Sequence, residues 1–145
     1  MNVSDLKIIV TGGASGMGKY FTLALAREGA SVAACDLNEE ALAAVKAEAE
    51  GLPGKVVTFK TNVAVEEDVV ALVQGTVDAF GAVNGLVNNA GIFRDGLLVK
   101  PDKETGKVKK MSLGQWQSVI DVDLTGPFLC TREVAAWMVE NKVKP

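Results

Sequence analysis

The chain has 145 residues, of which 48% are hydrophobic and 23% charged, and its formal net charge is −3 at pH 7. This composition is that of a soluble globular protein of one domain, and the acidic balance argues against a nucleic-acid binder, which needs a basic surface. Because the sequence holds no histidine and two cysteines, Ser-His-Asp and Cys-His catalysis by this chain alone is excluded, as are metal sites built on imidazole or four thiolates. We therefore expect no metal and chemistry that depends on carboxylates, hydroxyls, lysine, backbone amides or a cofactor.

The cysteines and the N-terminus predict a cytoplasmic location. Cys35 and Cys130 lie far apart, each inside an apolar stretch, which is typical of reduced core thiols rather than of a disulfide. Asp5 and Lys7 precede only a short apolar run, so the N-terminus lacks the layout of a signal peptide. No stretch approaches the roughly 20 apolar residues that span a bilayer, and we expect no membrane partner.

Short apolar runs alternate with amphipathic stretches over the first part of the chain. Glycines follow the first run, Asn38 caps the second helix, and Gly51 to Gly54 follow that helix. Strands separated by helices require right-handed crossovers, and so a parallel sheet covered on both faces in an α/β fold. The predicted elements are strands over Leu6–Thr11, Ser31–Cys35, Lys55–Lys60 and Gly85–Val87, and helices over Met17–Arg27, Glu39–Glu50 and Val65–Phe80.

Residues 94–110 interrupt this pattern. Arg94 and five lysines stand against three acidic residues there, so this stretch is basic while the rest of the chain is acidic. Pro101-Asp102 and Thr105-Gly106 mark turns, and we predict a protruding basic loop or hairpin. It either docks an acidic substrate or carrier or is a solvated excursion, and the general character of loops favours the second.

A last helix is predicted from its cap, Ser112, to about Asn141. Apolar residues recur along it at steps of four and three, and Asp123 interrupts this stripe, which predicts a carboxylate on a buried face. Pro127 lacks the N–H that would bond the Asp123 carbonyl, so we expect a kink there. This position either supports an ordered water or holds an acid that neighbouring backbone satisfies.

The first strand runs into Thr-Gly-Gly-Ala-Ser-Gly-Met-Gly over residues 11–18 and then directly into a helix. Glycines in such a turn let a pyrophosphate approach the amides of the helix N-terminus, where the helix dipole favours negative charge. Asp36 ends the second strand, where a carboxylate can accept both ribose hydroxyls of adenosine and repel a 2′-phosphate. This favours NAD over NADP. The alternative is that Asp36 serves the turn before Asn38.

These glycines and their spacing, together with Asn-Asn-Ala-Gly over residues 88–91, resemble the short-chain dehydrogenase/reductase family. The resemblance covers nearly the whole chain. It implies that residues 1–145 are the NAD-binding portion of a Rossmann-type, doubly wound parallel sheet, incomplete, with four strands of a larger one. The last helix looks like that of 3-oxoacyl-carrier-protein reductases. By position, the implied cofactor-binding residues are Gly12, Ser15, Gly16, Met17, Gly18, Asp36, Leu37, Asn62, Val63, Asn89, Ala90 and Gly91.

The chain departs from the family pattern at three places. Asn62-Val63 replaces an Asp-Val pair that contacts adenine, and Asp123 replaces a catalytic asparagine whose carbonyl holds a water in a proton relay. The family's Ser and Tyr-x3-Lys are missing, because the only tyrosine, Tyr20, is followed four residues later by Ala24. The resemblance therefore assigns Asp123 as a catalytic residue and leaves the proton-transfer role unassigned.

Two functions fit these observations. The favoured one is the N-terminal part of an NAD-dependent oxidoreductase, whose C-terminal portion would supply Ser, Tyr and Lys and complete a site for a small alcohol or carbonyl substrate. The fourth strand would then be an open edge. The alternative is a non-catalytic NAD-binding module or subunit. Family members are commonly tetramers, so we expect a homo-oligomer, in which Trp137 serves either an interface or the core.

Overall fold

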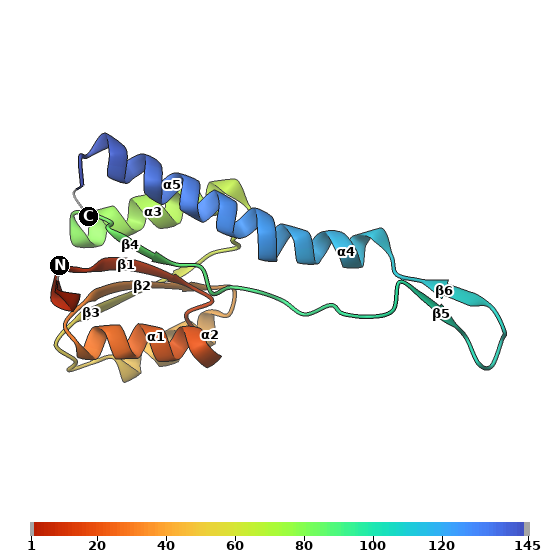
Figure 1. Cartoon of the computed structure of the whole chain (residues 1–145). Coiled ribbons are helices and arrows are strands. Elements are labelled where there is room, and N and C mark those ends of the chain that lie inside the picture. The colour runs from red at the N-terminus through yellow and green to blue at the C-terminus, as the bar shows by residue number, and fades with distance from the viewer. Residues whose placement is uncertain (1, 144–145) are drawn as a thin grey trace.

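A four-stranded parallel sheet forms the centre of the structure, a computed structural model that describes residues 2–143 (Figure 1). Its strands lie in the order β3-β2-β1-β4, and every pairing is parallel. The α/β class and the parallel sheet predicted from the sequence are therefore confirmed. The strands are β1 (Lys7–Thr11), β2 (Ser31–Asp36), β3 (Lys55–Lys60) and β4 (Gly85–Val87).

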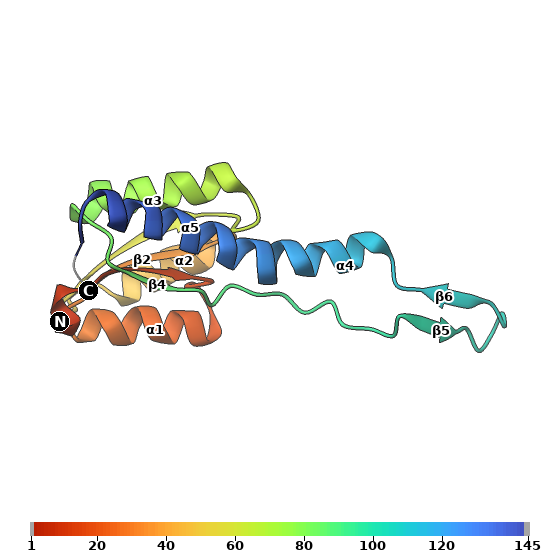
Figure 2. The ribbon, with the colours of Figure 1, turned by 45° about the horizontal axis from the view of Figure 1, so that its top comes forward.

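Helices cover both faces of the sheet, as the doubly wound arrangement requires (Figures 1 and 2). On one face, Val10 and Val32 pack in one cluster with Phe21 of the first helix. On the other face, Ile9 and Cys35 lie in a second cluster with residues of the third and last helices. The first face carries α1 (Gly16–Arg27) and α2 (Glu39–Glu48), and the second carries α3 (Glu66–Phe80) and α5 (Gly126–Glu140).

The central strands are apolar without alternation because both of their faces are buried. Residues 32–35 of β2 are fully buried, and neighbouring β1 is buried from Ile8 to Thr11. Local signals set the element ends. Asn38 Oδ1 accepts the Ala41 N–H at 3.0 Å and so begins α2, although α2 ends two residues before the predicted Glu50.

Strand β4 forms one edge of the sheet, and within residues 2–143 it pairs with β1 alone. Beside it, on the face that α1 covers, lies an open and almost wholly apolar groove of about 400 Å³. Val3 of the short 3-10 helix η1 (Val3–Asp5) is 40% exposed there. The groove is lined by Val3, Ile8, Phe21, Ala24, Leu25, Glu28 and Val87.

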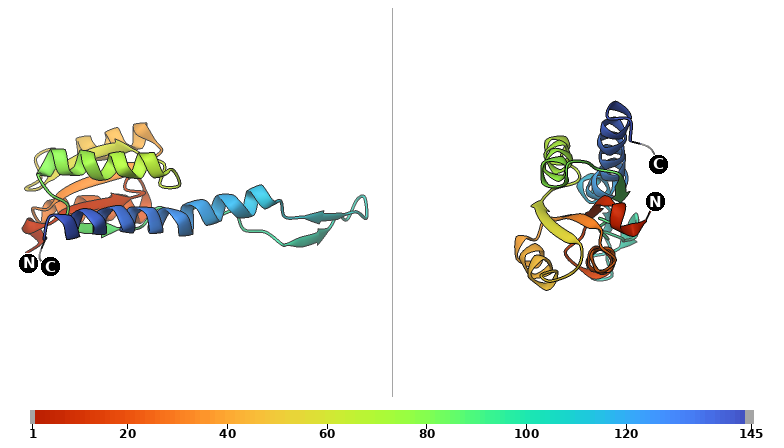
Figure 3. Two further views of the ribbon diagram at one scale, coloured as in Figure 1. Left: turned by 90° about the horizontal axis from the view of Figure 1, so that it is seen from above. Right: turned by 90° about the vertical axis from the view of Figure 1, so that its left-hand side faces the viewer.

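The chain between β4 and α5 extends away from the sheet (Figures 1 and 3). At its far end β5 (Val99–Pro101) and β6 (Val108–Lys110) pair as an antiparallel hairpin within the basic stretch. Every residue of these two strands is exposed. Helix α4 (Leu113–Ile120) then leads back, and Ser112 Oγ accepts the Gln115 N–H at 3.1 Å at its start.

The last predicted helix is divided by a π-helical turn, η2 (Asp121–Thr125), in which Gly126 N–H donates to the Asp121 carbonyl. A widened turn therefore accommodates Pro127. The prediction that Asp123 lies on a buried face was wrong, because its side chain is exposed. The prediction assumed that a core covers the apolar stripe along the whole helix. Helix α4 instead lies beyond the end of the sheet (Figure 1), and Trp116 in it is 53% exposed.

From Gly126 onward the last helix does pack on the sheet. Cys130 and Val134 of α5 are buried, and Trp137 is a partly buried member of the cluster on that face. Both cysteines are buried free thiols, as the sequence predicted. None of the helices in the described part of the chain combines the length and the apolar character that a bilayer crossing needs.

Candidate functional site

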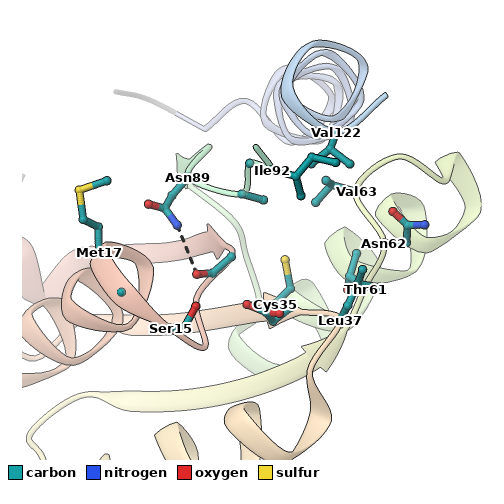
Figure 4. A pocket seen from close by; sticks show the side chains of 15 residues that line it. Ser15, Met17, Cys35, Leu37, Thr61, Asn62, Val63, Asn89, Ile92 and Val122 are labelled. Atoms are coloured by element: carbon teal, nitrogen blue, oxygen red, sulfur yellow. Dashed lines mark hydrogen bonds between the residues drawn. The ribbon is translucent and has the colours of Figure 1, made fainter. Parts of the chain in front are cut away.

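A cavity of about 360 Å³ opens at the carboxyl ends of the strands (Figure 4). Parallel α/β sheets bind ligands outside these ends, at the point where the strand order reverses, which here lies between β1 and β4. The cavity contains every residue that the resemblance assigned to a cofactor except Gly18. Its lining is Gly12, Ser15, Gly16, Met17, Cys35, Asp36, Leu37, Thr61, Asn62, Val63, Asn89, Ala90, Gly91, Ile92 and Val122.

The glycine turn leaves no room for a side chain at Gly12 or Gly18. Gly12 has a φ of +62°, and a Cβ there would lie 2.9 Å from the Cα of Ala90. A Cβ on Gly18 would lie 2.0 Å from the Gly12 carbonyl oxygen. Gly18 is buried beneath the turn, and it therefore shapes the cavity without lining it.

The N-terminus of α1 faces the cavity with backbone donors available. Ser15 is its N-cap residue but makes no side-chain cap hydrogen bond, and the first turn of α1 has no acidic residue. Ser15, Gly16 and Met17 are all exposed. A helix N-terminus carries unpaired N–H groups and partial positive charge, so this end of the cavity suits an anionic group such as a phosphate.

A hydrogen-bonded clamp joins the glycine turn to residues 88–91. The buried hydroxyl of Thr11 accepts the backbone N–H groups of Asn89 and Ala90, each at 3.0 Å, and donates to the Val87 carbonyl at 3.4 Å. In return, the Asn89 side-chain amide donates to the Thr11 carbonyl at 3.0 Å. It also donates to the Gly12 carbonyl at 3.2 Å (Figure 4). Two loops far apart in sequence thus form one rigid wall of the cavity.

Replacing Thr11 by valine is expected to destabilise the chain by about 2 kcal/mol, because the N–H groups of Asn89 and Ala90 lose their acceptor. Urea unfolding followed by circular dichroism measures this change. Thr11→Ser keeps the hydroxyl and serves as the matched control, with less than half of the loss. Equal stability of the valine variant and the wild type would show that the clamp contributes nothing.

Asp36 is held at the cavity by the backbone on either side of it. One carboxylate oxygen accepts the Asn38 N–H at 3.1 Å, and the other accepts the Ala14 N–H of the glycine turn at 3.4 Å. Asp36 therefore bonds the turn before Asn38 and also lines the cavity, and its contact with a ribose stays a prediction. The next residue, Leu37, is 61% exposed and offers an apolar surface at the same wall.

The loop after β3 forms another wall. Asn62 donates its backbone N–H to an Asp68 carboxylate oxygen at 2.9 Å, and its side-chain oxygen accepts the Ala64 N–H at 3.1 Å. The adenine contact that the resemblance implies for Asn62 would use this oxygen as an acceptor, and the bond from Ala64 already uses one of its two lone pairs. Val63 is buried at the cavity wall.

Four lining residues were missed by sequence reasoning: Cys35, Thr61, Ile92 and Val122. Burial raises the pKa of Cys35 to about 12, so this thiol stays neutral and contributes an apolar surface. The alternation of side chains along a strand could have predicted this position, because Cys35 and Asp36 end β2 beside the cavity and project from opposite faces of the sheet. No local signal places Val122, because its position depends on how the last helix crosses the sheet.

Asp123 lies outside this cavity and lines a neighbouring, largely apolar one of about 410 Å³, which shares Ile92 with the first. Its carboxylate accepts the Ile92 N–H at 2.9 Å. Of the two alternatives for Asp123, the geometry corresponds to an acid bonded by neighbouring backbone. Arg94, Gln115 and Trp116 also line this second cavity.

Within residues 2–143 no group of three or more His, Cys, Asp or Glu side chains is arranged to hold a metal ion. The first cavity instead combines helix amides, a fixed carboxylate and apolar walls. This donor set fits a dinucleotide, whose phosphates need N–H donors and whose ribose hydroxyls need an acceptor. The backbone at Gly12 and Gly18 lies too close to neighbouring protein atoms to tolerate a side chain, so glycine at these positions allows the close packing of the turn that forms the cavity wall.

Comparisons with known proteins agree with this geometry. The family model for short chain dehydrogenase matches residues 6–143. The 3-oxoacyl-[acyl-carrier-protein] reductase FabG of Thermotoga maritima is 41% identical over 142 residues, which are 98% of this chain and 54% of that protein. The 2,5-dichloro-2,5-cyclohexadiene-1,4-diol dehydrogenase of Sphingobium indicum is 40% identical over 99% of this chain and 52% of its own. The chain thus spans about half the length of the curated relatives it matches.

Solved structures show the same likeness. A short chain dehydrogenase from Bacillus anthracis matches with a TM-score of 0.81 and 30% identity, over 98% of this chain and 55% of the other. A short-chain type dehydrogenase/reductase from Mycobacterium marinum matches with a TM-score of 0.81 and 28% identity, over 98% of this chain and 52% of its own. By its sequence, its strand order and the lining of its cavity, the chain belongs to the short-chain dehydrogenase family.

Proposed function

We propose that residues 1–145 are the N-terminal, NAD-binding portion of an oxidoreductase that transfers hydride between NAD and a small alcohol or carbonyl substrate. One observation carries this proposal. The same cavity holds the unpaired amides at the start of α1 and the backbone-fixed carboxylate of Asp36. These are the two groups that a dinucleotide requires, one for its phosphates and one for its adenosine ribose.

The cavity residues divide by chemistry. The amides of Ser15, Gly16 and Met17 would hold the phosphates, and the Asp36 carboxylate would hold the adenosine ribose. Leu37, Asn62 and Val63 offer apolar and amide surface for the adenine, while Asn89, Ala90 and Gly91 would line the nicotinamide ribose. When bound, NAD supplies the hydride acceptor or donor, and these residues orient it.

NAD is preferred over NADP in this proposal because of the charge at Asp36. Both carboxylate oxygens accept backbone N–H groups, which keeps the negative charge in place beside the cavity. A 2′-phosphate on the ribose would meet this charge directly. Ser15, which precedes the middle glycine of the turn, offers no cation in compensation.

The partner of this chain is the remaining C-terminal portion of the same enzyme. The relatives are about twice as long as the matched region, and Ser and Tyr-x3-Lys have no counterpart in this sequence. The edge of β4 and the adjoining apolar groove are surfaces that a further strand and helix would cover.

The proposed location is the cytoplasm, where thiols stay reduced, and the two buried free thiols support it. The proposed assembly is a homo-oligomer, and the exposed apolar side chains of Leu124 and Phe128 support it.

Calorimetric titration of the purified chain with NAD⁺ and with NADP⁺ tests the proposal. We expect NAD⁺ to bind at least tenfold more tightly, a difference of about 1.4 kcal/mol. Asp36→Asn keeps the size of the side chain and removes its charge, so it should remove most of this preference. A folded chain that binds neither dinucleotide, or that prefers NADP⁺, would contradict the proposal.

A further inference from the structure

An ion pair lies next to Asp36 but outside the cavity wall. The ammonium of Lys60, at the end of β3, is 2.7 Å from Oε2 of Glu39, the first residue of α2. Lys60 is the register partner of Asp36 across β2 and β3. Register partners leave a sheet on the same face, from backbones about 4.8 Å apart. Lys60 and Asp36 thus project from neighbouring strands on the same face of the sheet, and the ammonium of Lys60 is paired with Glu39.

The Lys60–Glu39 pair contributes little to the stability of the fold. The side chains of Lys60 and Glu39 are 59% and 68% exposed, and exposed ion pairs contribute little to stability. Its effect is on the lysine itself. The hydrogen bond and the charge of Glu39 raise the pKa of Lys60. A lysine ammonium is protonated at neutral pH in any case, so the effect of Glu39 is to occupy that ammonium. A free lysine next to a ribose site would be a ready partner for a phosphate group.

We propose that Glu39 is a specificity-determining positioning residue that acts through Lys60, an inference that rests on the proposed NAD site. By binding the ammonium of Lys60, Glu39 keeps the cation on the strand neighbouring Asp36 from pairing with the 2′-phosphate of NADP. Asp36 repels this phosphate, and Glu39 prevents Lys60 from offsetting the repulsion. NAD has no 2′-phosphate, so its binding does not depend on the pair.

Glu39→Gln tests this role with a change of one charge and almost no change of shape. The dissociation constant of NADP⁺ is expected to fall about fivefold at low salt, because the ammonium of Lys60, no longer paired with residue 39, can attract the 2′-phosphate. The dissociation constant of NAD⁺ should stay within about twofold of the wild type. Glu40→Gln is the matched control, because Glu40 lies in the same turn of α2 and makes no ion pair in the described part of the chain.

A second variant separates a role in specificity from a merely structural one. Adding Lys60→Met to Glu39→Gln should return NADP⁺ binding to the wild-type level or below, because the freed cation is gone. Circular dichroism checks that each variant is folded. Adenosine 2′,5′-bisphosphate and adenosine 5′-monophosphate serve as smaller probes of the same difference.

A gain for NADP⁺ alone that disappears with Lys60→Met supports the role of Glu39. If Glu39→Gln changes the dissociation constants of NAD⁺ and NADP⁺ equally, the effect is one of packing and the role of Glu39 is overturned. If Glu40→Gln tightens NADP⁺ binding as much as Glu39→Gln does, the effect is one of overall charge and the role is overturned too. A wild-type chain that is folded and binds neither dinucleotide overturns the proposed function, and the role of Glu39 with it.

Discussion

Replacing Gly18 by alanine is expected to abolish dinucleotide binding and to destabilise the chain by about 3 kcal/mol or more. The added Cβ would lie 2.0 Å from the Gly12 carbonyl oxygen and 2.5 Å from Nδ2 of Asn89. Neither neighbour can move freely. The Gly12 carbonyl and the Thr11 carbonyl both accept hydrogen bonds from the Asn89 side-chain amide, which fixes the two neighbours relative to each other. Relief of the clash would therefore open the wall of the cavity.

Urea unfolding and calorimetric titration with NAD⁺ measure the two effects of Gly18→Ala. Gly114→Ala is the matched control, because Gly114 lies in α4 and a Cβ there meets nothing within 4 Å. Alanine in an exposed helix should leave stability unchanged or raise it by up to about 1 kcal/mol. If Gly18→Ala unfolds at the wild-type urea concentration, the turn is less tightly packed than the distances indicate.

The features that sequence reasoning predicted well depend on local signals. The strands Lys55–Lys60 and Gly85–Val87 have the predicted bounds, because turn residues flank both apolar runs. The caps at Asn38 and Ser112 are formed as expected, since the bonded N–H lies three residues along the chain. The parallel direction of the strands follows from the crossovers that intervening helices impose.

What the sequence could not predict depends on contacts between distant segments. Asp123 was expected to be buried because the period of apolar residues says which side of a helix is apolar but not whether anything covers it. Val122 reaches the cavity through the crossing of the last helix over the sheet. The pairing of Lys60 with Glu39 follows from strand register and from the start of α2, two features far apart in sequence.

The purified chain is expected to bind NAD⁺ without transferring hydride. Hydride transfer to a carbonyl needs a proton donor for the oxygen, and general acid catalysis contributes about 10²–10⁴-fold. Tyr20, the only tyrosine, is 66% exposed on α1 and is followed four residues later by Ala24 rather than lysine. A spectrophotometric assay of NADH oxidation, with a 3-oxoacyl thioester as the substrate, should show no turnover above background.

Co-expression with the region of the Thermotoga maritima relative that this chain does not match should raise that rate by about 100-fold or more, since it would add the missing acid and base. Association would bury the apolar groove and the edge of β4. Val3→Asp places a charge at the exposed rim of this groove. This variant should lose the gain and keep NAD⁺ binding, because Val3 does not line the nucleotide cavity. Co-purification of the two polypeptides without activity would instead favour a non-catalytic NAD-binding subunit.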